Sequence, residues 1–141
     1  MSCVGELLKR SLRHFVNVMI LVFADDQTLT VLPDISAVRV ECETVDVEEG
    51  TYRFFDELGR TLKPRFTSPV RRSSLLFGIQ VVGGGNFELD VDPEDDGSNF
   101  DKSVANAVVI EPNRWFATIE EMAHHVAENR KRKLGAMLRD V

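Results

Sequence analysis

The sequence predicts an α+β fold built on a curved antiparallel sheet or partly open β-barrel of about seven to eight strands. Short apolar or alternating runs separated by turn residues indicate these strands. Helical spacing near the two ends of the chain adds a short N-terminal helix and a longer C-terminal amphipathic helix. No repeat or linker divides the 141 residues. We therefore expect a single globular domain over residues 1–141, with residues 1–17 as a candidate for a loosely attached extension.

The N-terminal residues allow three interpretations. In the first, residues 5–16 form a short amphipathic helix and residues 18–24 form a fully buried strand. In the second, residues 1–24 act as a signal peptide, and the protein is exported. In the third, translation starts at Met19, and the preceding residues are an extension. We favour the buried strand.

Two strand predictions follow from the next residues. Residues 28–32 alternate and form a hairpin with residues 18–24. Residues 36–43 alternate between apolar and charged side chains, which predicts a half-buried strand with Cys42 as a buried thiol. Cys42 and Cys3 form neither a disulfide framework nor a metal-type spacing. This cysteine usage favours a reducing, cytoplasmic location.

A further hairpin is expected over residues 51–66. Asp56 at the entry to the turn and Gly59 near its end predict a type I turn that closes with a bulge. The two prolines that follow, Pro64 and Pro69, are expected to bracket an irregular stretch.

The glycine run at residues 83–85 predicts a hairpin turn that joins strands at residues 75–82 and 86–91. A phosphate-binding loop would instead open onto a helix, so we expect no nucleotide and no other cofactor here. A last apolar strand is expected over residues 104–110.

The C-terminal helix has the clearest signature. Thr118 and Glu121 have the spacing of a capping box, which provides partners for the first free N–H groups. One helical stripe then carries the apolar residues Ile119, Met122, Ala123, Val126 and Ala127. The same stripe continues through Arg130, Lys133, Leu134 and Met137. We expect the first half to pack on the sheet and the second half to project past its edge.

Arg130 stands where this stripe would normally hold an apolar residue. Its head group could snorkel into water, pair with a carboxylate or face a partner, and we favour snorkelling. Further basic residues are clustered at other points of the sequence. The simplest interpretation of such clusters is a solvent-exposed charged surface without a binding role. The candidate partner-binding residues are Arg130, Lys131, Lys133, Arg71 and Arg72.

The acidic segment over residues 92–103 partly imitates a calcium loop. Asp92, Glu94 and Asp96 occupy the first three ligand positions, but Ser103 stands where a bidentate Glu is needed. These three acids are therefore weak candidates, and we expect no metal site.

His124 and His125 are adjacent on a predicted helix, so their imidazoles point about 100° apart and do not readily share an ion. No strong catalytic motif is present, and the interpretation leans away from an enzyme. The formal net charge of −6 makes nucleic acid an unfavoured partner. The longest apolar run, Val18 to Ala24, is too short to span a membrane as a helix.

The function stays unknown at this level, and two hypotheses compete. The leading one is a small non-catalytic interaction module, of an accessory or inhibitor type, that binds another protein or itself through charged surface patches. The alternative is a small-molecule carrier or enzyme with a site inside the curved sheet.

Overall fold

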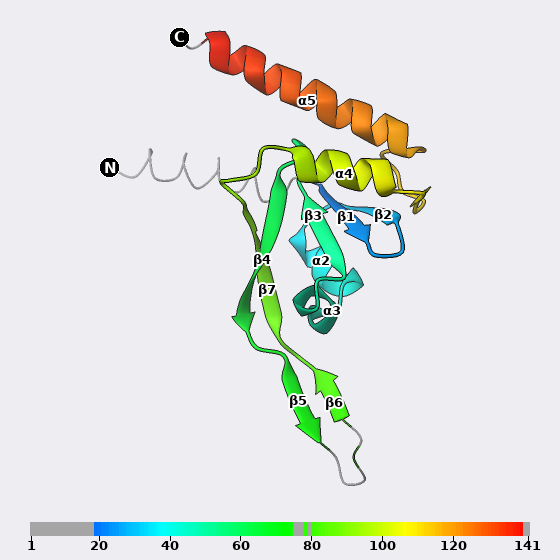
Figure 1. Cartoon of the computed structure of the whole chain (residues 1–141), viewed down its shortest axis with the longest axis vertical. Helices are drawn as coiled ribbons and strands as arrows, with labels where there is room; N and C mark the ends of the chain where they lie inside the picture. Colours follow the sequence, from blue (N-terminus) through cyan, green and yellow to red (C-terminus); the bar gives the residue numbers. More distant parts are fainter. Residues whose placement is uncertain (1–18, 75–77, 79, 140–141) are drawn as a thin grey trace, which may run out of the picture.

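The computed structural model describes residues 19–74, 78 and 80–139 (Figure 1). The helix expected over residues 5–16 lies outside this part of the chain. The described residues form eight strands and four helices, which confirms the α+β class with a long C-terminal helix. No helix in this part of the chain is long and apolar enough to cross a membrane.

Six strands form one open sheet whose edge strands, β7 and β8, do not meet. In the order of the sheet they are β7 (Asn86–Val91), β4 (Thr61–Ser68), β3 (Tyr52–Phe55), β1 (Ile20–Ala24), β2 (Thr28–Leu32) and β8 (Val109–Ile110). Neighbours are antiparallel except β2 and β8, which are parallel. The sheet is therefore curved and mostly antiparallel, and it does not close into a barrel.

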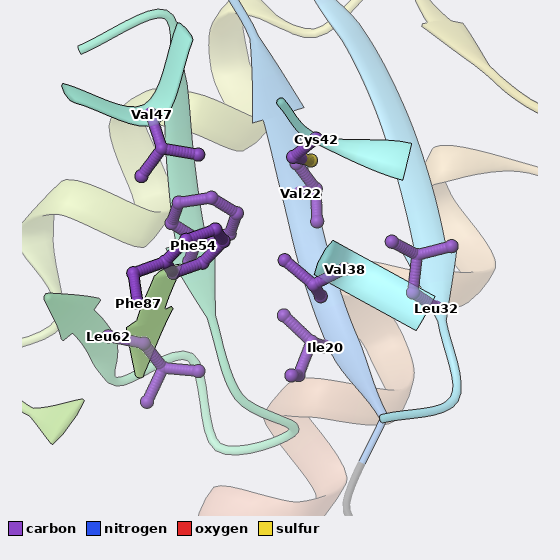
Figure 2. Close-up of a cluster of buried hydrophobic side chains, with 9 residues drawn as sticks. All are labelled: Ile20, Val22, Leu32, Val38, Cys42, Val47, Phe54, Leu62 and Phe87. Atoms are coloured by element: carbon purple, nitrogen blue, oxygen red, sulfur yellow. The ribbon is translucent and has the colours of Figure 1, made fainter. Parts of the chain in front are cut away.

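Helices α2 (Ile35–Glu41) and α3 (Thr44–Glu48) cover one face of this sheet. Figure 2 shows the cluster that they enclose: Ile20, Val22, Leu32, Val38, Cys42, Val47, Phe54, Leu62 and Phe87. The buried thiol predicted at Cys42 is confirmed, since this residue is 3% exposed.

The strand predicted over residues 36–43 is wrong, because α2 occupies most of this stretch. The Asp34 carboxylate accepts the Ala37 N–H at 2.9 Å and caps the helix. The four-residue spacing of Val38 and Cys42 then buries both, whereas Val40 is 81% exposed.

Helices α4 (Ser98–Asn106) and α5 (Ile119–Arg139) cover the opposite face. This second cluster consists of Leu21, Phe23, Leu29, Val31, Phe55, Phe100, Phe116, Met122 and Val126. Strand β1 sends alternate side chains into the two clusters, so the buried strand predicted over residues 18–24 is confirmed for Ile20–Phe23. Residue 18 lies outside the described residues.

The strand predicted over residues 104–110 is largely wrong. Its first residues belong to α4, because Phe100, Ser103 and Val104 have the spacing of one helical face toward the second cluster. Within this stretch, β8 at its end is the part that pairs as a strand.

Strands β4 and β7 leave the body together as a two-stranded arm, and β5 (Arg71–Ser74) pairs with β6 (Gln80–Gly83) farther along it (Figure 1). The hairpin predicted between residues 75–82 and 86–91 is therefore wrong. The strand after the glycine run pairs with β4 instead, as Phe66 with Phe87 and Ser68 with Asn86. Alternation of apolar and polar residues predicts that a segment is a strand, but it does not predict which strand pairs with it.

The irregular stretch predicted between Pro64 and Pro69 is also wrong over most of its length, because β4 extends to Ser68. Pro64 lies beyond the two residues that β4 pairs with β3. Its missing N–H therefore removes no hydrogen bond to that neighbour.

Candidate functional site

Helix α5 begins at the predicted capping box, and its first turns pack on the body. The Glu121 N–H donates to Thr118 Oγ1 at 3.1 Å, and the Ala117 N–H donates to Glu121 Oε2 at 2.8 Å. Met122 and Val126 are 0% and 1% exposed. The prediction that the first half of α5 packs on the sheet is confirmed.

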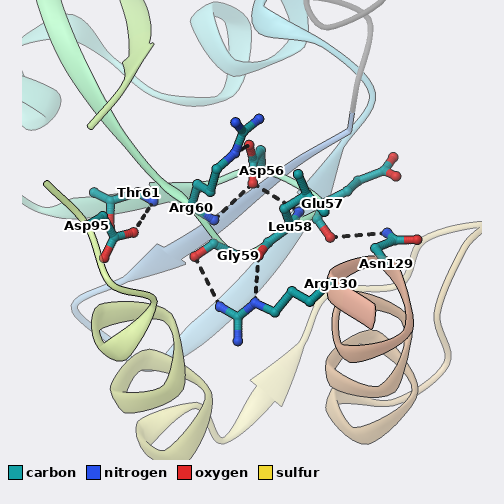
Figure 3. Close-up of polar contacts among 9 residues, drawn as sticks. All are labelled: Asp56, Glu57, Leu58, Gly59, Arg60, Thr61, Asp95, Asn129 and Arg130. Atoms are coloured by element: carbon teal, nitrogen blue, oxygen red, sulfur yellow. Dashed lines mark hydrogen bonds and ion pairs between the residues drawn. The ribbon is translucent and has the colours of Figure 1, made fainter. Parts of the chain in front are cut away.

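Arg130 joins α5 to the turn between β3 and β4 (Figure 3). Its Nε donates to the Leu58 carbonyl at 2.7 Å, and its Nη2 donates to the Gly59 carbonyl at 3.4 Å. The neighbouring Asn129 amide donates to the Glu57 carbonyl at 3.1 Å. The guanidinium thus points into the protein, and the snorkelling interpretation is wrong.

Two further groups surround the same guanidinium. It lies 5.1 Å from the centre of the Phe100 ring, and its Nη1 lies 3.5 Å from Asp101 Oδ1. The Asp101 side chain is 69% exposed, so this ion pair is weakened by water. Carbonyl groups of the turn are therefore the main partners of Arg130.

The turn itself has the predicted type I geometry with a bulge. Asp56 Oδ1 accepts the N–H groups of Leu58 and Arg60 at 3.0 and 2.9 Å. Gly59 adopts φ +73°, and the Asp56 N–H donates to the Arg60 carbonyl. Asp56 is 6% exposed, and its Oδ2 accepts Arg60 Nε at 2.6 Å. These bonds hold the Leu58 and Gly59 carbonyls in position for Arg130.

Beyond Arg130, the helix projects past the body (Figure 1), and we call residues 131–138 the free end of α5. Leu134, Met137 and Leu138 are 59%, 61% and 68% exposed. Their spacing puts them on one stripe, and Lys131 and Lys133 flank this stripe on either side. The prediction that the second half of α5 projects past the sheet is confirmed for residues 131–138, whereas Arg130 contacts the body.

The other predicted basic residues lie elsewhere. Arg71 and Arg72 belong to β5 in the arm, whereas Lys131 and Lys133 belong to the free end of α5 (Figure 1). Arg72 Nη2 is 2.6 Å from Glu48 Oε1 of α3. The structure therefore does not bring the two basic groups together.

The acidic segment uses its carboxylates to order its own backbone. Asp92 Oδ1 accepts the Glu94 N–H at 3.0 Å, and Asp96 Oδ1 accepts the Ser98 N–H at 2.9 Å. The hydrogen bonds from Ser98 lower the pKa of Asp96. Among the residues that the structure describes, no three His, Cys, Asp or Glu side chains form a group that could hold a metal ion.

Asp95 was missed by the sequence analysis and connects this segment to β4. It accepts the Thr61 N–H at 2.6 Å and the Gly97 N–H at 3.0 Å. Partial burial favours the neutral acid, but these backbone hydrogen bonds outweigh it and lower the pKa of Asp95.

The histidines of α5 do not converge. His125 packs its ring 5.2 Å from that of Phe116, and its Nε2 lies 3.6 Å from Glu57 Oε2. His124 is exposed.

A groove between β4 and α4 was also missed. It has a volume of about 480 Å³, and its charged lining residues are Arg53, Lys63 and Lys102. These residues come from three separate segments, so no local motif could have revealed them.

No protein-family pattern, characterised protein or solved structure matches this chain.

Proposed function

We propose that this protein is a non-catalytic interaction module, of an accessory or inhibitor type, that binds an acidic partner protein through the free end of α5. One observation carries the proposal. Leu134 and Met137 lie on the helical stripe that begins at the buried residues Met122 and Val126, and Leu138 lies at the edge of this stripe. Each of these three residues is more than half exposed. A partner that covers this stripe would complete the burial that the body begins.

The energetic gain is large enough to support binding. Full burial of one Leu or Met side chain contributes roughly 1.5–3 kcal/mol, so covering the exposed parts of three contributes about 3–5 kcal/mol. The helix is already formed, which lowers the ordering cost of association.

The charge of the free end indicates the character of the partner. Lys131, Arg132 and Lys133 are consecutive and exposed in a chain whose formal net charge is −6. A local cationic surface of this kind steers an acidic surface into contact. The separation of the two basic groups supports a protein partner over a nucleic acid, which needs a continuous basic track.

The experiment is affinity capture from the source cell at low and high salt, with quantitative mass spectrometry. The full-length protein is compared with a variant carrying Leu134→Gln, Met137→Gln and Leu138→Gln. Ala136→Gln, on the opposite side of the helix, is the matched control. Glutamine preserves helix propensity, so circular dichroism should be unchanged in both.

We expect a partner that the wild type and the control retain and the triple variant loses, with weaker retention at high salt. The absence of any partner that depends on the stripe would refute the proposal. Analytical sedimentation of the purified protein provides a second test. If the wild type self-associates and the triple variant does not, the stripe binds a second copy of this chain, and the proposal of an acidic partner is wrong.

We further propose a cytoplasmic location. The free, buried thiol of Cys42 supports a reducing compartment. Mass spectrometry of the mature N-terminus tests this, because cleavage near residue 24 would instead indicate export.

A further inference from the structure

We propose that the groove between β4 and α4 binds a small organic phosphate. This site goes beyond the protein-binding function above and uses different residues.

The groove exists because β4 separates from β3. These strands pair only as Phe54 with Leu62 and Phe55 with Thr61. The next residues outward, Arg53 and Lys63, lie beyond this pairing. Pro64 has no N–H with which to extend it. The sheet therefore opens at this point, while β4 continues into the arm.

The side chains of Arg53 and Lys63 belong to the α4 side of the opening. Phe54 and Leu62 pack in the cluster under α2 and α3, and side chains alternate along a strand. Arg53 and Lys63 therefore share the face of Phe55, which packs against α4. One side of α4 forms the opposite wall of the groove, through Asn99, Lys102, Ser103 and Asn106.

Two of the three cations are uncompensated. Lys63 Nζ is 3.3 Å from Asp92 Oδ2, and this ion pair satisfies its charge. Arg53 forms no ion pair or side-chain hydrogen bond with any residue that the structure describes. Lys102 forms none in this part of the chain either, although its charge contributes weakly to lowering the pKa of Asp96. No Asp or Glu lines the groove.

The lining fits a doubly charged head group. A phosphate monoester carries roughly −1.5 to −2 charges near neutral pH and three strong acceptor oxygens. Arg53 and Lys102 match that charge, and the amides of Asn99 and Asn106 add neutral donors. The volume of about 480 Å³ lies within the usual range for a small-molecule site. Pro64, which is half-buried at the groove, offers apolar lining to the organic portion.

The test is calorimetric titration of the full-length protein with AMP and with inorganic phosphate, with adenosine as the uncharged control. Amide chemical shifts of Asn99 and Asn106 report whether binding occurs in the groove. Two double variants remove equal charge: Arg53→Gln with Lys102→Gln in the groove, and Arg65→Gln with Arg114→Gln outside it. All four arginine and lysine side chains are exposed, so both variants should fold.

We expect AMP to bind with a Kd of about 1 mM or tighter, with inorganic phosphate weaker and adenosine not binding. The groove variant should weaken AMP binding by about tenfold or more, whereas the outer variant should stay within about twofold. Absence of saturable binding by both phosphates, equal losses in the two variants, or unshifted groove amides would each overturn the proposal. The groove variant retains the free end of α5, so failure here is distinguishable from failure of the partner proposal.

Discussion

Replacing Arg130 with Met should destabilise the protein although the side chain is partly exposed. The substitution keeps an apolar stem and removes the hydrogen bond to the Leu58 carbonyl, which as a bond from a charged group contributes roughly 1.5–3 kcal/mol. The contact with the Phe100 ring adds about 0.5–1 kcal/mol. The longer bond to Gly59 and the water-exposed pair with Asp101 add little. Because water replaces part of what is lost, we expect a net loss of about 2–3 kcal/mol.

The assay is equilibrium urea unfolding followed by the fluorescence of Trp115, the single tryptophan, which packs beside the second cluster. A thermal scan should show a fall in Tm of about 7–10 °C for a domain of this size. Arg132→Met is the control, because Arg132 is exposed on the free end of α5. If the Arg130 variant stays within about 0.5 kcal/mol of the wild type, or if both variants lose equal stability, the carbonyl contacts do not fix α5 to the body.

Three further predictions concern buried or strained groups. Gly59→Ala should lower the free energy of unfolding by about 1–3 kcal/mol, measured in urea, because φ is +73° and the new Cβ would lie 2.4 Å from Arg130 Nη2; an unchanged midpoint would contradict this. In a Cys3→Ser background, Cys42 should react with a thiol reagent only as fast as the protein opens, because burial, with nearby acids, raises its pKa to about 11. This raised pKa stabilises the fold fully below about pH 9, and the contribution is lost as pH rises toward 11, so an alkaline unfolding series that stays flat would count against it. Asp95→Ala should destabilise the protein by about 1–3 kcal/mol at pH 7. The pKa of Asp95 is lowered in the folded protein, so its carboxylate stabilises the fold above its unfolded-state pKa of about 3.9. This stabilisation is lost as pH falls through the folded-state pKa. The free energies of unfolding of the variant and the wild type should therefore become equal in acid.

Local patterns predicted the parts of the fold that depend on local physics. The buried strand β1 was predictable because its residues are apolar at successive positions, which places apolar side chains on both faces of the sheet. The turn at Asp56 and Gly59 was recognisable because its carboxylate and its positive φ require particular residue types. Thr118 and Glu121 identified the start of α5 for the same reason.

The wrong secondary-structure predictions came from short runs that fit two periods. Val38, Val40 and Cys42 satisfy alternation, but Val38 and Cys42 also satisfy the four-residue period of a helix. Only the cap at Asp34 discriminates between them, and it favours the helix. Strand partners were less predictable still, because pairing across the arm depends on contacts between distant residues.

The site features depended on tertiary structure. Lys131 and Lys133 were recognisable on a surface stripe because a helix fixes their relative positions. Arg53, Lys63 and Lys102 converge only because β4 separates from β3 and α4 covers the opening. Arg130 occupies an apolar position of the stripe because its partners are backbone carbonyls, which carry no signature in the sequence.

Arg130 lies between two halves of α5 that have different roles, one in stability and one in binding. Before it, substitutions at Met122 or Val126 would remove buried contacts and lower stability. After it, Leu134 and Met137 make few contacts with the body, so their replacement should affect binding alone. The carbonyl contacts of Arg130 also hold the free end in a fixed direction, because they act at the last point where the helix touches the β3–β4 turn. Loss of Arg130 should therefore weaken partner binding as well as stability, even though its guanidinium faces the body, since a loosened helix pays a larger ordering cost on association.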